Sequence, residues 1–112
     1  MTIAEESFGD VTVLILVGTL MGEPEASEFQ RRKFDLLEAN RKKLVLDLSG
    51  LKLINSYGLG TLIAALMFTR KRGGDIRLAS VSNVISHVIQ TVQLDKIFEI
   101  FETVEEAVQS FQ

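Results

Sequence analysis

The chain has 112 residues, of which 46% are hydrophobic and 24% are charged. This balance fits one folded domain over residues 1–112, and it excludes a disordered chain and a second domain. The chain has no cysteine, which excludes disulfides, thiolate metal ligands and a cysteine nucleophile, and its net charge of −3 gives no general attraction for nucleic acid.

The N-terminal residues lack the basic and then apolar pattern of a secretion signal. The apolar runs are interrupted well short of the roughly 18 residues that a membrane span needs. We therefore expect a cytoplasmic protein with no direct membrane insertion.

The first part of the chain predicts a hairpin followed by a helix. Residues 3–8 and 11–18 are expected to form two strands around a Gly-Asp turn. Pro24 is typical of a first helical turn, and the helix is expected to run to about Asn40. The core-facing side of this helix is predicted to comprise Ala26, Phe29, Leu36 and Leu37.

The middle of the chain predicts a strand, a helix and a second strand. "KLVLDL", residues 43–48, is the first of these strands, and "DIRLA", residues 75–79, is the second. Between them a very apolar helix begins near Ser56. A Gly-Gly pair marks its end, where basic residues complement the helix dipole.

The last part predicts a helix, a short strand and a terminal helix. Apolar residues between Ser80 and Gln93 follow helical spacing although valine and isoleucine favour strands. "IFEIF", residues 97–101, is a short strand, and Thr103 with Glu106 forms a capping box. Repeated strand–helix–strand units predict an α/β fold with a mostly parallel sheet, an N-terminal antiparallel hairpin and about four helices.

The helix after Ser56 has two apolar stripes on nearly opposite sides. The first comprises Leu59, Leu62, Ile63, Leu66 and Met67 and suits packing on the sheet. The second comprises Tyr57, Thr61, Ala64 and Phe68. A neighbouring helix or a binding partner must cover this second stripe.

Ser56 is placed to cap this helix, and Asn55 could do the same. Gly58 and Gly60 are weak helix formers, each costing up to about 1 kcal/mol relative to alanine in a helix interior. They would leave bare backbone beside the serine, where another molecule can approach closely. The Gly-x-Gly pair alone does not make a dinucleotide fingerprint.

The stretch "LVLDLSGLKLINSYGLGTLIAAL" resembles the central signature of the STAS domain in bacterial anti-sigma factor antagonists. Length and element order also resemble the single-domain form of that family, which implies a STAS-like mixed sheet. The resemblance implies a regulator that binds an anti-sigma factor with serine kinase activity and so releases a sigma factor for transcription. The kinase would phosphorylate Ser56, the phosphorylated form would lose its partner, and a phosphatase would reset the cycle.

The resemblance assigns roles to several further residues. Asp47 matches a strand-end aspartate of the family, and it either orients local backbone amides or is an ordinary loop-facing acid. The partner surface it implies comprises Asn55, Tyr57, Gly58, Gly60, Thr61, Phe68, Met21 and Glu23.

This sequence departs from the family pattern close to the serine. Asn55 stands where the family commonly has aspartate, Met21 stands at an acidic position, and Tyr57 replaces a small residue. Glu23 would supply the missing acid only if its loop bends suitably. These changes bear on recognition by the kinase and leave the fold expectation intact.

An enzyme is not expected, because the only histidine, His87, falls on the polar side of its helix and no Gly-x-Ser-x-Gly elbow surrounds Ser56. No metal or cofactor is expected either. The alternative is a non-phosphorylated module of the same fold, either a stress-complex scaffold or an accessory subunit of a lipid transporter, anchored by Tyr57 and Phe68. A homodimer is also compatible with the sequence.

Overall fold

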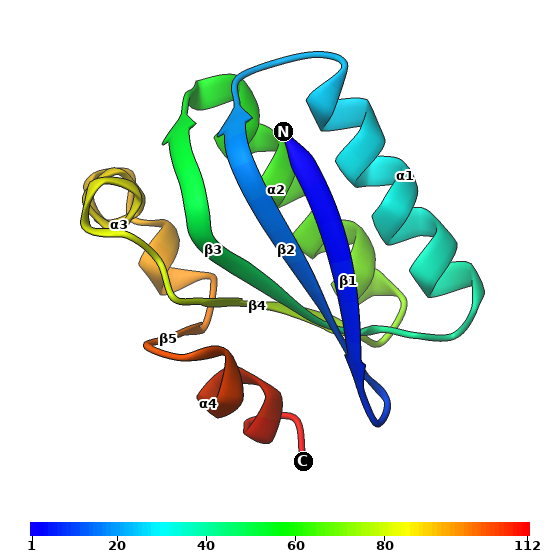
Figure 1. Cartoon of the computed structure of the whole chain (residues 1–112). Helices are drawn as coiled ribbons and strands as arrows, with labels where there is room; N and C mark the ends of the chain where they lie inside the picture. The colour runs from blue at the N-terminus through cyan, green and yellow to red at the C-terminus, as the bar shows by residue number, and fades with distance from the viewer.

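The computed structural model describes residues 1–112 and contains one five-stranded sheet, in which the strands lie in sequence order from β1 to β5 (Figure 1). The strands are β1 (Thr2–Phe8), β2 (Val11–Leu20), β3 (Lys43–Ile54), β4 (Asp75–Ala79) and β5 (Ile100–Phe101). The helices are α1 (Glu25–Glu38), α2 (Ser56–Lys71), α3 (Asn83–Thr91) and α4 (Val104–Gln109), with a short 3-10 helix η1 (Leu94–Lys96) before β5. β1 pairs antiparallel with β2, and every later pair is parallel, as predicted.

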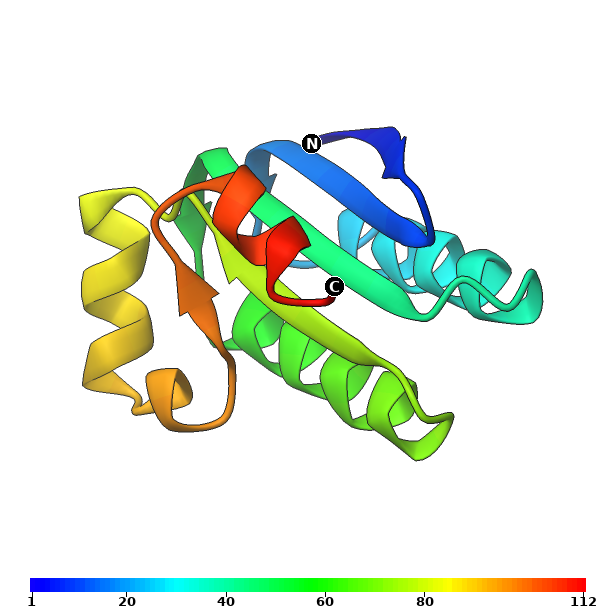
Figure 2. The ribbon, with the colours of Figure 1, turned by 90° about the horizontal axis from the view of Figure 1, so that it is seen from below.

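The helices form two layers around the sheet. Helices α1, α2 and α3 cover one face, and α4 covers the other (Figure 2). The larger core lies under the three helices, where Phe29 of α1, Leu66 of α2 and Ile89 of α3 are almost fully buried. The smaller core joins α4 to the opposite face through Ala107 and Val108. The predicted core-facing residues of α1 are all buried.

The structure refines several predicted boundaries, and the short strand predicted over residues 97–101 is confined to β5 (Ile100–Phe101). β3 continues to Ile54 instead of ending near residue 48. α3 ends at Thr91, because Gln93 adopts a left-handed conformation with φ of 61° that no α-helix continues. Pro24 caps α1 from just outside the helix, and the Thr103 hydroxyl accepts a hydrogen bond of 3.1 Å from the Glu106 amide, as the capping pattern predicted.

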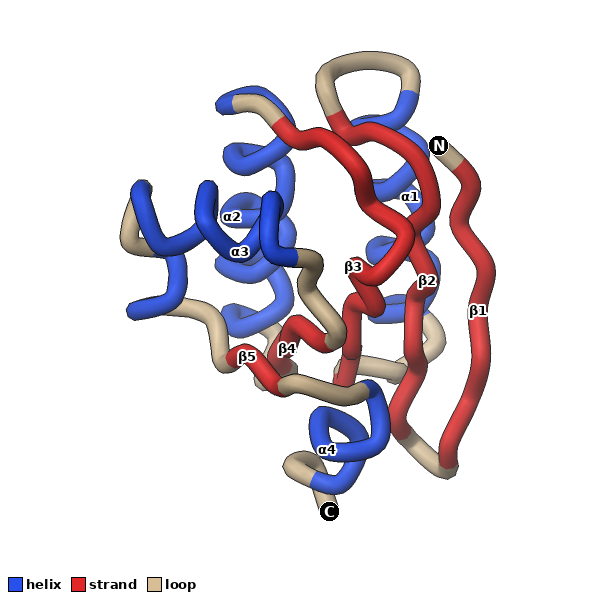
Figure 3. Tube along the Cα trace, turned by 60° about the vertical axis from the view of Figure 1, so that its left-hand side comes forward, coloured by secondary structure: helices blue, strands red, loops and turns tan.

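β2 and β3 extend beyond the rest of the sheet as a two-stranded ribbon (Figure 3). β4 pairs with β3 only from Lys43 to Asp47, and a β-bulge follows in β3, where the register with β2 shifts. We call residues 18–20 of β2, beyond the last β1 pair at Val17, and residues 51–54 of β3 the β2–β3 ribbon. Its far end leads directly into the loop before α1 and into the first turn of α2, so the ribbon positions both segments.

None of the helices combines the length and the apolarity that a membrane crossing requires. No three side chains among His, Asp and Glu gather closely enough to hold a metal ion.

Candidate functional site

The first turn of α2 is capped by Asn55. Its side-chain oxygen accepts a hydrogen bond of 3.0 Å from the Gly58 amide, and its Nδ2 donates one of 2.8 Å to the Met21 carbonyl. Ser56, the first expected cap, is the first helical residue and its side chain is exposed. Asn55 therefore links the helix to the loop after β2, and the Ser56 hydroxyl does not cap the helix.

The two glycines of this turn have different roles. A Cβ at Gly58 would collide with the Leu20 carbonyl oxygen and lie 2.7 Å from Ile54 Cγ1, so close packing against the β2–β3 ribbon requires this glycine. A Cβ at Gly60 would meet no atom within 4 Å. The expected bare backbone beside the serine is found at Gly60, whereas Gly58 is buried.

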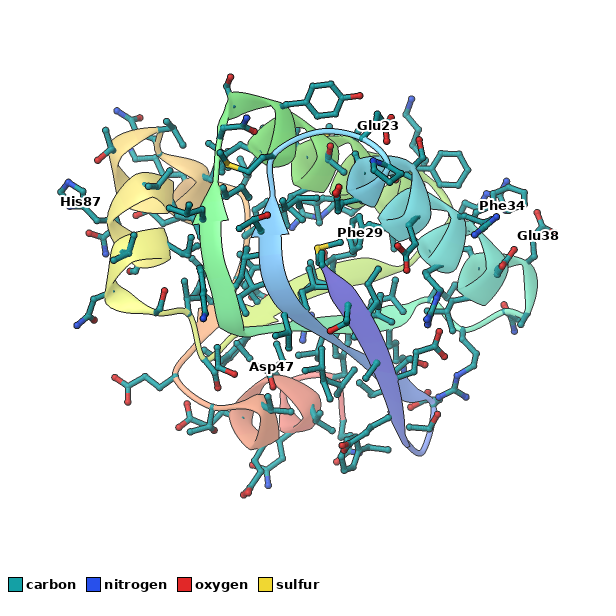
Figure 4. All side chains as sticks on the ribbon, turned by 45° about the horizontal axis from the view of Figure 1, so that its top comes forward. Glu23, Phe29, Phe34, Glu38, Asp47 and His87 are labelled. Carbon is teal, nitrogen blue, oxygen red and sulfur yellow. The ribbon has the colours of Figure 1, made fainter.

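Glu23 brings a carboxylate to the start of α2 (Figure 4). It accepts hydrogen bonds of 2.8 Å from the Ser27 amide and hydroxyl, and one of 3.1 Å from the Tyr57 hydroxyl. The hydrogen bonds from Ser27 lower the pKa of Glu23, and the hydrogen bond to Glu23, together with its charge, raises the pKa of Tyr57. The loop therefore bends so that the Glu23 carboxylate contacts Tyr57 and lines the same groove as Ser56, while Met21 is exposed.

A shallow groove of about 480 Å³ runs between α1 and α2 from this point. It is lined by Glu23, Ala26, Ser27, Gln30, Ser56, Tyr57, Gly60, Thr61 and Ala64. Gln30 donates from Nε2 to the Thr61 carbonyl at 3.0 Å, but its Oε1 is buried without a hydrogen-bond partner. Ser27 and Gln30 were not predicted from the sequence, although Gln30 follows Ala26 by four residues and so lies on the same face of α1.

Helix α1 covers part of the second stripe of α2, in which Tyr57 and Ala64 stay exposed. Thr61 is buried, and the Phe68 ring lies 6.4 Å from that of Phe34 between centroids. Tyr57 remains 51% exposed. Phe68 lies three turns from Ser56, roughly 18 Å along the helix, so the structure does not bring the two together.

Two other residues singled out in the sequence lie away from the serine. Asp47 is on the α4 side of the sheet and accepts hydrogen bonds from the Ser49 amide at 3.0 Å and hydroxyl at 2.8 Å, within the β-bulge (Figure 4). It thus orients a local backbone amide. His87 is exposed on α3 and points away from the molecule, so it provides no base for Ser56.

The family model of the STAS domain matches residues 3–107, and the chain therefore belongs to this family. A protein of Thermotoga maritima, provisionally named an anti-sigma factor antagonist, is 28% identical over 101 residues that cover 89% of each chain. A relative from Thermotoga neapolitana has the same identity and coverage.

Solved structures agree with this assignment. The crystal structure of the Thermotoga maritima protein has a TM-score of 0.88 and covers 96% of this chain and 92% of its own. The phosphorylated form of the Bacillus cell fate determinant SpoIIAA has a TM-score of 0.76 at 17% identity, covering 99% of this chain and all of its own. At that identity the likeness shows the STAS fold alone.

Proposed function

We propose that this protein is an anti-sigma factor antagonist that binds an anti-sigma factor with serine kinase activity. Binding would use the first turn of α2 and the β2–α1 loop, and phosphorylation of Ser56 would end it. The observation that carries this proposal is the exposed Ser56 side chain at the start of α2, next to the open space at Gly60 and the exposed Tyr57. The names of the Thermotoga relatives support the class of partner.

The physical basis of the switch is the charge of the phosphate. A phosphoryl group adds about −1.5 to −2 charges, which a helix N-terminus accommodates within the folded domain. In an interface the same charge must lose water, and here it would also face the Glu23 carboxylate, which lines the same groove. A hundredfold loss of affinity needs only about 2.7 kcal/mol.

Substitutions at Ser56 test the switch on a partner recovered from the native cells. Ser56→Ala should bind the partner as tightly as the native chain and escape regulation, whereas Ser56→Asp should bind at least tenfold more weakly. Ser7→Asp, an exposed position of β1 near the opposite end of β2, is the matched control and should change nothing. Equal affinity of Ser56→Asp and the native chain would refute the switch.

A permanently bound module of the same fold, such as a scaffold or a transporter accessory subunit, is the second candidate. The half-exposed Tyr57 at the mouth of the groove favours it, since an aromatic ring can anchor a partner without any modification. Intact mass with site mapping, on protein from growing and from stressed cells, separates the two. A phosphate on Ser56 that varies with condition supports the switch, and its absence in every condition supports the module.

A further inference from the structure

Basic side chains gather at the end of the molecule opposite Ser56, where the α1–β3 and α2–β4 connections meet. The Asp75 amide donates to the Lys42 carbonyl at 3.0 Å, and Lys42 Nζ lies 3.5 Å from the Arg72 carbonyl oxygen. We call this surface the basic end. It comprises Phe34, Arg41, Lys42, Lys71 and Arg72, and the buried Lys33 lies with Arg72 against the Phe68 ring.

The fold leaves most of this positive charge without a carboxylate partner. Arg72 pairs with Glu38 at 3.2 Å, but Arg41, Lys42 and Lys71 form no ion pair. Arg41 instead donates to backbone carbonyls of the β1–β2 turn and to the Thr12 hydroxyl. The basic end is therefore locally positive on a chain whose net charge is −3.

Lys33 is the most unusual of these cations, because it is only 6% exposed and has no acidic partner. Its ammonium nitrogen lies 4.0 Å from the centroid of the Phe68 ring, and Arg72 lies 4.7 Å from the same centroid. Burial lowers the pKa of Lys33, and the neighbouring Arg72 charge lowers it further. Two like charges thus share one ring, and an external anion would relieve their repulsion.

An aromatic ring is exposed among the cations. Phe34 is 42% exposed, and the Arg72 guanidinium lies 5.7 Å from its ring centroid. Figure 4 shows Phe34 and Glu38 projecting outward from α1. None of the five cavities of the molecule is lined by a residue of the basic end.

We propose that the basic end docks on the anionic surface of a lipid bilayer. Cations held at one end of the molecule attract anionic headgroups, and an exposed ring between them can enter the headgroup layer. A helix or a peptide would dock in a groove, and none of the five cavities is lined by residues of the basic end. Single-stranded nucleic acid is bound by successive stacking rings, whereas the basic end exposes one.

This orientation would leave the candidate partner site free. Ser56 begins α2 and Lys71 ends it, and a helix of 16 residues is about 24 Å long. A protein held through its basic end would therefore present the first turn of α2 away from the bilayer. The inference does not depend on phosphorylation of Ser56, so either proposal can fail alone.

Vesicle sedimentation with the full chain tests the proposal. The probes are vesicles of phosphatidylcholine alone and vesicles of equal parts phosphatidylcholine and phosphatidylglycerol. We expect binding to the anionic vesicles only, weakening as salt rises. Lys42→Gln with Lys71→Gln should weaken it roughly 25-fold, since each lysine near an anionic surface contributes about fivefold. The control with the same charge change is Lys52→Gln with Lys96→Gln, two exposed lysines elsewhere, which should bind like the native chain.

A second variant tests the aromatic contribution. Phe34→Ala should weaken binding to anionic vesicles several-fold, while Met67→Ala, at a somewhat more exposed apolar position of α2, should not. Circular dichroism would establish that each variant is folded. No binding to anionic vesicles, equal binding to neutral ones, or an equal loss in the control pair would overturn the proposal. Tighter binding to a single-stranded oligonucleotide than to the anionic vesicles would overturn the choice of a membrane.

Discussion

Replacing Gly58 by alanine tests how α2 is seated on the β2–β3 ribbon. The new methyl group would overlap the Leu20 carbonyl oxygen and lie 2.7 Å from Ile54 Cγ1, and the backbone oxygen cannot turn away as a side chain would. Overpacking of this kind costs up to about 3 kcal/mol, against a gain of up to about 1 kcal/mol from better helix propensity, which leaves a net loss of about 1–2 kcal/mol. At about 4–8 °C per kcal/mol, the melting temperature should fall by roughly 4–16 °C.

Gly60→Ala is the matched control, because it adds the same methyl group two residues later in α2, where a Cβ would meet no atom within 4 Å. It should raise the free energy of unfolding by about 0.5–1 kcal/mol, since alanine favours the helix. Urea unfolding followed by circular dichroism measures both variants. If Gly58→Ala were as stable as Gly60→Ala, the close approach of α2 to Leu20 would be wrong.

Three further measurements address the cap, the tyrosine and the buried lysine. Asn55→Ala should lower the free energy of unfolding by about 1–2 kcal/mol in urea, whereas Ser56→Ala should change it by less than about 0.5 kcal/mol, because Asn55 is the cap; equal losses would contradict this assignment. Tyr57 is the only tyrosine, so the phenolate absorbance measures its titration alone. The pKa of Tyr57 should lie above 10.0 in the native chain and should be lower in Glu23→Gln. An identical titration in the two proteins would exclude the contact with Glu23. At neutral pH the free energy of unfolding of Lys33→Met should lie within about 1 kcal/mol of that of the native chain. The substitution removes the cost of burying a charge, but it also removes the cation–π contact, and the two effects oppose each other. Burial lowers the pKa of Lys33 in the folded state, so the unfolded state binds more protons at pH values between that pKa and 10.5. The native chain should therefore gain stability relative to Lys33→Met as the pH rises through this window. A difference in stability that stays constant with pH would refute this reasoning.

The order and type of the main elements could be predicted because each carries its own local signal. Helical spacing correctly overrode the strand propensity of valine and isoleucine in α3. The antiparallel hairpin and the parallel remainder followed from the connections between the elements. The extension of β3 to Ile54 was not foreseen, because a β-bulge breaks the regular alternation on which strand prediction depends.

The candidate site was predictable as a stretch of sequence but not as a surface. Whether Glu23 faces Tyr57 depends on how the β2–α1 loop bends, and no local pattern encodes that. The glycine pair looked equivalent in the sequence, yet only Gly58 meets the carbonyl of a distant strand. Phe68 belonged to the same helical stripe as Tyr57, but its cover depends on where α1 crosses α2, which is a tertiary property.

The β2–β3 ribbon separates the residues that hold the site from those that present it. Leu20 and Ile54 at its end, and Gly58 of α2 packed against them, are buried, while Tyr57 and Gly60 are exposed. After a gene duplication, the exposed positions could therefore diverge in partner choice at little cost to folding, because most exposed substitutions change stability by less than about 0.5 kcal/mol. Several such proteins could then coexist in one cell on a shared scaffold without competing for the same partner.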